Sequence, residues 1–269
     1  MTTLEFQRDK VAIASDQALY FDMLAEMGHT KHIGGLAATI RLMELTNPQN
    51  KDDVLDVGCG VGIAAAFLAQ QYSCHVVGVD ITPRMLIRAR ERAERKGVAA
   101  FTDFRVADMH ALPFEEGYFD AVIAESVICF SSDKEHVLAE MIRVLKPGGF
   151  VAFTEATWRI LPPPDVARQM AQVLGLPEGM LQHEAWQAVL QSSQLEQLVA
   201  EEYPITFREE ARNQYRRIDV SDYLHTFGRF LKVFMNPAYR AIYRGALASA
   251  PASYYHYVGY GVYGGVKPQ

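Results

Sequence analysis

From residue 54 to residue 62 the chain reads VLDVGCGVG, an apolar run that ends in three glycines at alternate positions. The run predicts a buried strand, and a glycine-rich turn between a strand and a helix lets backbone N–H groups approach a ligand at the helix N-terminus. The spacing around Gly58 and Gly60 is G-x-G-x-G, whereas the dinucleotide-binding fingerprint is G-x-G-x-x-G. Asp56 lies two residues before Gly58, where a carboxylate repels a pyrophosphate and suits a ligand with an ammonium group.

Further polar residues follow the neighbouring strands. Asp80 lies twenty residues after Gly60, at a position where a carboxylate can accept hydrogen bonds from both ribose hydroxyls of a nucleoside, and Ile81 directly follows it. After the next strand, Asp108 can accept a hydrogen bond from an adenine amino group, and Met109 can pack on the adenine ring. Together these positions predict a nucleoside-binding edge of the sheet.

The flanking pattern predicts an α/β, doubly wound fold, because apolar strand-like runs alternate with amphipathic helical segments. The predicted strands are residues 53–57, 75–79, 104–107, 119–124 and 150–154. Helices are expected over residues 83–97 and 133–145, the second with a capping box of Ser132 and Glu135. We expect a single domain over residues 1–269. Its expected parts are a helical cover (1–50), a Rossmann-like core (51–207), a helical and aromatic lid insertion (208–253) and a last strand (254–269).

These motifs resemble the class I S-adenosylmethionine-dependent methyltransferases over roughly residues 51–155. The run LPF at 112–114 before YFD at 118–120 is most similar to the small-molecule branch that includes quinone and sterol C-methyltransferases. The resemblance implies a seven-stranded sheet with an antiparallel last strand, S-adenosyl-L-methionine as cofactor, and no metal.

The resemblance also implies roles for individual residues. The turn with Asp56, Gly58 and Gly60 would hold the methionine part of the cofactor. Asp80 and Ile81 would hold the ribose, and Asp108 and Met109 would contact the adenine. Glu125 falls where the fourth strand opens on both cofactor and substrate. These implied cofactor-binding residues are Asp56, Gly58, Gly60, Asp80, Ile81, Asp108, Met109 and Glu125.

A sulfonium methyl is already activated, so transfer requires in-line alignment, exclusion of water and sometimes a base. For a carbon or oxygen acceptor, Glu125 and His32 are the candidate catalytic bases. His29 and His32 lie in a glycine-containing turn that either folds over the cofactor or is a solvated turn with incidental histidines. The acceptor atom, whether N, O, S or C, is left open.

Substrate choice is expected in the C-terminal region, because residues 203–263 hold 14 of the 29 aromatic residues. Residues 208–244 carry eight arginines or lysines against four acids. One interpretation is an aromatic lid in which Arg212, Arg216 and Tyr215 bind an anionic or lipophilic small-molecule acceptor. The alternatives are a helical cap with solvated arginines and an interface of a homodimer.

Composition excludes several other classes. The net charge of −6 provides no basic field for nucleic acid, and three cysteines without metal-ligand spacing indicate neither a disulfide framework nor a zinc site. We expect a cytoplasmic protein with no signal peptide and no membrane span. An NAD-dependent oxidoreductase is disfavoured by Asp56 and the glycine spacing. A protein that binds S-adenosylmethionine or S-adenosylhomocysteine for regulation or scaffolding, without methyl transfer, is the alternative function.

Overall fold

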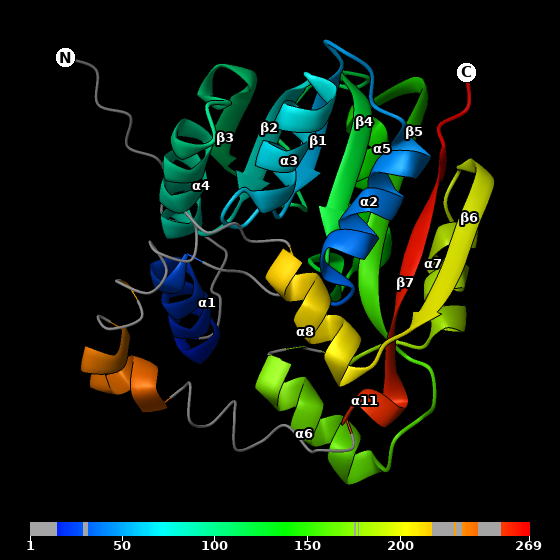
Figure 1. The fold of residues 1–269 in the computed structure, drawn as a ribbon. Helices are drawn as coiled ribbons and strands as arrows, with labels where there is room; N and C mark the ends of the chain where they lie inside the picture. The colour runs from blue at the N-terminus through cyan, green and yellow to red at the C-terminus, as the bar shows by residue number, and fades with distance from the viewer. Residues whose placement is uncertain are drawn as a thin grey trace.

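A computed structural model describes residues 15–28, 32–174, 176, 178–216, 229, 233–241 and 254–269 (Figure 1). Within these residues, seven strands form one sheet in the order β3-β2-β1-β4-β5-β7-β6. The strands are β1 (Asp53–Val57), β2 (His75–Asp80), β3 (Thr102–Val106), β4 (Phe119–Glu125), β5 (Leu145–Trp158), β6 (Glu196–Pro204) and β7 (Val258–Val266). Strands β1 to β5 pair in parallel, and β7 runs antiparallel between β5 and β6. The predicted fold class is confirmed.

Helices cover both faces of this sheet and the carboxyl ends of its strands (Figure 1). They are α1 (Ser15–Met27), α2 (Gly35–Thr46), α3 (Ile63–Tyr72), α4 (Pro83–Arg95), α5 (Lys134–Val144), α6 (Pro164–Leu174), α7 (His183–Gln191), α8 (Phe207–Arg216) and α11 (Tyr254–Tyr257), with the 3-10 turns η1 (Ala99–Phe101) and η2 (Ile128–Phe130). Helices α2, α3 and α4 pack with one face, and α5 and α7 pack with the other. Side chains alternate along a strand, so Val54 joins the first core and Leu55 the second.

The strand predictions are right to within a few residues, with two exceptions. Strand β5 extends over Leu145–Trp158 at both ends of the predicted run, and the last strand, predicted from residue 254, begins only at Val258 because Tyr254–Tyr257 form the helix α11. The first residue of β5, Leu145, pairs with Phe119, so the strand begins directly where α5 ends. The capping box predicted for α5 is wrong in its first member. Asp133, and not Ser132, is the N-cap residue, and its carboxylate accepts a hydrogen bond from the His136 N–H at 3.0 Å.

Part of the expected N-terminal cover belongs to the core. Helix α2 places Ala38, Leu42 and Met43 fully inside the first hydrophobic core, against the sheet. Helix α1 lies with α8 and α6 beyond the carboxyl ends of β1 to β5, at the lower edge of the sheet (Figure 1). The region of residues 1–50 therefore has two roles, a sheet-packing helix and a covering helix.

Two arginines of α4 connect the cover to the glycine-rich turn. Arg88 contacts Glu26 of α1 at 3.1 Å. Arg92 is buried, and its guanidinium donates to the Val61 carbonyl at 2.5 Å and to the Gly28 carbonyl at 3.3 Å. Arg92 thereby links Gly28, at the end of α1, to the turn after β1. None of the helices in the described part of the chain has the length and apolarity needed to span a bilayer.

Two glycines share a left-handed backbone conformation but differ in the space around them. Comparing substitutions at the two positions distinguishes the cost of backbone strain from the cost of a steric clash. Gly62 and Gly97 have φ of +72° and +69°. A Cβ on Gly62 would lie 2.8 Å from the Ala89 Cβ of α4, whereas a Cβ on Gly97 would meet nothing within 4 Å.

We therefore expect Gly97→Ala to cost only the left-handed backbone term, about 1–2 kcal/mol. Gly62→Ala should cost about 1–3 kcal/mol more, because α3 and α4 must separate to admit the methyl group. Urea unfolding of both variants measures the difference, and equal losses would show that close approach of the two helices is unimportant.

Candidate functional site

The turn after β1 is held against the end of β2 by backbone hydrogen bonds. The Cys59 N–H donates to the Val79 carbonyl at 2.9 Å, and the Gly62 N–H donates to the Cys59 carbonyl at 2.9 Å. Gly58 and Gly60 both have positive φ, +69° and +52°. A Cβ on Gly58 would lie 2.4 Å from a methyl of Val127, so a side chain there would force the loop after β4 away. The turn is a compact backbone surface at the carboxyl ends of β1, β2 and β4.

Asp80 joins this turn to the start of α4. Its carboxylate accepts hydrogen bonds from the Gly60 N–H at 3.0 Å and from the Thr82 N–H at 2.8 Å. Burial raises the pKa of Asp80, and the N–H donors oppose part of that rise. Thr82 makes no side-chain cap bond, so Asp80 satisfies the first N–H at the entrance to α4. The two carboxylate oxygens retain lone pairs that can accept hydroxyl groups from a ribose.

The two predicted catalytic residues are brought together by the fold. Glu125 ends β4, and its Oε2 lies 3.3 Å from Nδ1 of His32, with both side chains almost fully buried. The Thr39 hydroxyl of α2 donates to the other oxygen of Glu125 at 2.5 Å. His32 Nε2 lies 2.9 Å from the Gly35 carbonyl, where α2 begins. Glu125 of β4, His32 of the turn before α2 and Thr39 of α2 thus form a single cluster, called the β4–α2 cluster.

Comparisons with known proteins identify the kind of domain. Residues 55–153 match the family model described as a methyltransferase domain. Phosphoethanolamine N-methyltransferase 1 of Arabidopsis thaliana is 32% identical over 152 residues, which are 56% of this chain and 30% of that protein. Residues 55–153 are thus a methyltransferase domain, in agreement with the predicted resemblance. It spans about a quarter to a half of the length of this and other curated relatives from plants and Streptomyces.

Solved structures share the fold of this chain. The [4+2]-cyclase SpnF superposes with a TM-score of 0.75 at 23% identity, covering 96% of this chain and 98% of that one. Phosphoethanolamine N-methyltransferase 2 of Haemonchus contortus, in complex with phosphomonomethylethanolamine and S-adenosylhomocysteine, superposes with a TM-score of 0.72 at 20% identity. These alignments cover 95% of this chain and 59% of the nematode protein. At these identities the likeness shows only the fold. One of the two proteins is named as a cyclase and the other as a methyltransferase, so the fold alone does not define the reaction.

The other residues predicted to contact the cofactor are Asp56, Asp108, Met109 and Ile81, and the structure shows their surroundings. Asp56 is buried within β1. Asp108 accepts a hydrogen bond from the His110 N–H at 2.9 Å, and the same oxygen lies 2.7 Å from the His110 ring. Met109 is half-buried against the second core, and Ile81 lies half-buried beside Asp80. One oxygen of Asp108 is therefore shared with His110, and the adenine contact of Asp108 and Met109 stays a prediction.

The predicted substrate residues are only partly described. Arg212 is exposed on α8. The side chains of Tyr215 and Arg216, like His29 and most of residues 217–253, lie outside the described residues. Among the described residues of α8, Glu210 contacts the turn before α2, where its carboxylate accepts a hydrogen bond from the Gly34 N–H at 3.2 Å. This contact comes from an acid, whereas the prediction named arginines.

Sequence reasoning missed Glu155, the most deeply buried acid at this end of β5. It is 1% exposed, and its Oε1 accepts the N–H groups of Ile128 and Cys129 at 2.8 and 3.2 Å. Burial raises the pKa of Glu155 to about 7, and the two N–H donors and Lys134 oppose part of that rise. The available signal was an acid in the middle of an apolar strand, FVAFTEATW at residues 150–158.

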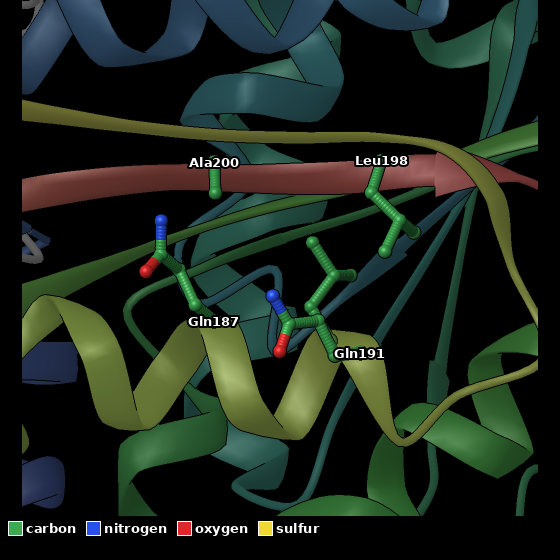
Figure 2. A pocket seen from close by; sticks show the side chains of 5 residues that line it. Gln187, Gln191, Leu198 and Ala200 are labelled. Carbon is green, nitrogen blue, oxygen red and sulfur yellow. The ribbon is translucent and has the colours of Figure 1, made fainter.

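A surface groove lies at the opposite edge of the sheet. It is lined by Gln187, Leu190 and Gln191 of α7 and by Leu198 and Ala200 of β6. The amide side chains of Gln187 and Gln191 extend from the helix toward the side chains of the strand (Figure 2). Strands β4, β5 and β7 separate β6 from β1, so this groove is not part of the donor site. Within the described ranges, no group of three or more His, Cys, Asp or Glu side chains is arranged to hold a metal ion.

The raised pKa of Glu155 predicts a pH-dependent stability difference. The unfolded carboxyl ionises near 4.5 and the folded one near 7, so ionisation destabilises the fold progressively as the pH rises through this window. Glu155→Gln keeps an oxygen for the two N–H donors and removes the charge. At pH 8 we expect the variant to gain on the order of 2–3 kcal/mol over wild type, and at pH 4.5 almost nothing.

Thermal unfolding between pH 4.5 and pH 8 measures this difference. Glu115→Gln, at an exposed site, is the matched control and should show no such trend. A Glu155→Gln variant whose advantage is the same at both pH values would contradict the assignment.

Proposed function

We propose that this chain transfers the methyl group of S-adenosyl-L-methionine to a small organic acceptor by in-line displacement. The observation that carries the proposal is the Asp80 carboxylate, held on the glycine-rich turn by the Gly60 N–H and at the entrance to α4 by the Thr82 N–H. A carboxylate at the end of the second strand, beside a turn with Asp56 before its glycines, suits a nucleoside that also carries an ammonium group. The match of residues 55–153 to a methyltransferase domain supports the same cofactor.

Each part of the proposed cofactor has residues that would hold it. Asp56 and the backbone of Gly58 and Gly60 would hold the amino-acid part, and Asp80 with Ile81 the ribose. Asp108 and Met109 would flank the adenine, and Glu125 would face the junction of cofactor and acceptor. When bound, S-adenosylmethionine supplies an activated methyl group on a sulfonium. The chain then has to align the acceptor, exclude water and take up a proton where the acceptor releases one.

The proposed acceptor site lies under α8. Glu210 fastens this helix to the turn before α2, and Arg212, two residues further along, is exposed. An anionic or lipophilic acceptor, bound by Arg212, Arg216 and Tyr215 under an aromatic lid, remains our proposal for its class. Apart from His32, the β4–α2 cluster consists of an acid, Glu125, and a neutral hydroxyl, Thr39. An anionic acceptor would therefore bind at the arginines of α8 and not beside Glu125. A cytoplasmic location, supported by three free cysteines, and a homodimer are proposed as well.

Titration calorimetry with S-adenosylhomocysteine tests the donor site. Asp80→Asn removes the charge that would accept the ribose hydroxyls, and loss of charge-assisted hydrogen bonds worth about 1.5–3 kcal/mol should weaken binding about 10- to 100-fold. Asp103→Asn, on the exposed part of β3, is the matched control and should bind like wild type. NADH should not bind. Wild-type protein that binds NADH, or binds neither compound, would overturn the proposal.

Methyl transfer itself needs a separate assay. Isotopically labelled S-adenosylmethionine is incubated with separate panels of lipophilic acids, thiols and amines, and labelled product is extracted and counted. Transfer to one class establishes the reaction. Donor binding without transfer to any of them would instead favour the binding or scaffold alternative.

A further inference from the structure

The hydrogen-bond partners of His32 determine which ring nitrogen carries a proton. Nε2 lies 2.9 Å from the Gly35 carbonyl, and a carbonyl oxygen can only accept. Nε2 is therefore the donor, and Nδ1 is the nitrogen that faces Glu125. Both side chains are largely removed from water, with exposures of 4% for His32 and 6% for Glu125. Water therefore does little to screen whatever charge lies between them.

The contact between Nδ1 and Glu125 requires one further proton. If His32 were neutral and Glu125 ionised, a lone pair on Nδ1 would face a carboxylate oxygen 3.3 Å away, which is repulsive. The Thr39 hydroxyl already donates to the other oxygen of Glu125, at 2.5 Å. A proton between Nδ1 and Oε2 turns the repulsive contact into a hydrogen bond whichever of the two atoms carries it, and into a charge-assisted one when Nδ1 carries it.

Charged groups of both signs lie on the elements that contact β4 and α2. The acids include Asp56 on β1, Glu155 on β5 and Glu210 on α8. Of the cations, Lys134, Arg41 and Lys146 contact Glu178, Glu201 and Asp120 at 2.6, 2.6 and 2.7 Å, and Arg208 and Arg212 on α8 are exposed. The buried contact between Nδ1 and Oε2 itself is therefore the observation that carries the shared proton.

We propose that Glu125 and His32 hold one proton in common, release it when the sulfonium donor binds, and take up the acceptor's proton during transfer. The inference rests on the proposed function and adds to it the destination of the proton. As the bond between acceptor and methyl carbon forms, the carbon–sulfur bond breaks and its electron pair stays on sulfur. The acceptor's own bond to hydrogen breaks, and its proton goes to the pair.

Charge balance is the physical reason. A bound sulfonium adds a positive charge to a site of low dielectric, so release of the shared proton leaves the pair with a net charge of −1 that compensates it. After transfer the sulfur is a neutral thioether, and the pair is neutral again with the acceptor's proton. The total charge of the buried site is the same before and after the reaction. The pair is therefore a base only when the methyl donor is present.

Proton release on binding can be measured without any acceptor. Wild-type protein is titrated with S-adenosylmethionine and with S-adenosylhomocysteine at pH 7.5, in phosphate and in Tris, two buffers with different heats of ionisation. The difference in heat gives the number of protons released. We expect the sulfonium compound to release close to one proton more than the thioether. Glu125→Gln should abolish this excess, whereas the exposed control Glu115→Gln should keep it.

The outcomes separate the two proposals. If neither compound binds, the proposed function fails, and the inference that rests on it fails too. If both bind wild-type protein with equal proton release, the donor site stands and the shared proton is overturned. Should Glu125→Gln fail to fold by circular dichroism, His32→Asn provides the same comparison. An excess that survives in a folded variant of either residue would also overturn the inference.

Discussion

The hydrogen bond from the Gly60 N–H to the Asp80 carboxylate is the contact on which the site depends. It joins the turn after β1 to the end of β2, at the point where the strand order of the sheet reverses between β1 and β4. The backbone N–H groups of the turn, the entrance to α4 and the loop after β4 meet there. Only a residue without a side chain fits at Gly58, because Val127 approaches it so closely. The same backbone geometry that closes the turn leaves the carboxylate ready for a ligand.

Several acidic side chains are buried near the carboxyl ends of the central strands, where the candidate site lies. Asp80 and Glu155 both have pKa values raised by burial, and Asp56 and Glu125 are also largely removed from water. A protein selected for stability alone would not concentrate carboxylates at the ends of its central strands. Hydrogen bonds reduce the free-energy cost of burying these carboxyl groups. Backbone N–H groups donate to Asp80 and Glu155, and Thr39 and His32 contact Glu125. These donors hold the acidic side chains in place at the carboxyl ends of the strands.

Helix α2 connects the stability of the fold with the chemistry of the site. Its buried side of Ala38, Leu42 and Met43 packs on the sheet, while Thr39, between them in sequence, reaches Glu125. The turn before the helix presents His32, and Glu210 of α8 closes on Gly34. Movement of the cover would therefore alter the environment of Glu125 through a helix that is itself part of the core. Arg92 connects the same turn to the glycine-rich loop from the other side.

The sequence by itself determined the fold class, the positions of the central strands, the glycine-rich turn and the acid at position 80, because these depend on local spacing and strand periodicity, which tertiary context changes little. The order of the strands in the sheet came only from the structure. The sequence also indicated Glu125 and His32 as separate candidates. Only the tertiary structure decided that they touch, since 93 positions separate them in the chain and their contact depends on how α2 packs across β4 and β5. Glu155 was missed because burial of an acid depends on the loop that covers it, and residue type alone favours an exposed position. The N-cap of α5 was assigned to Ser132 instead of Asp133 because adjacent polar residues can both cap a helix, and the backbone path into the helix chooses between them.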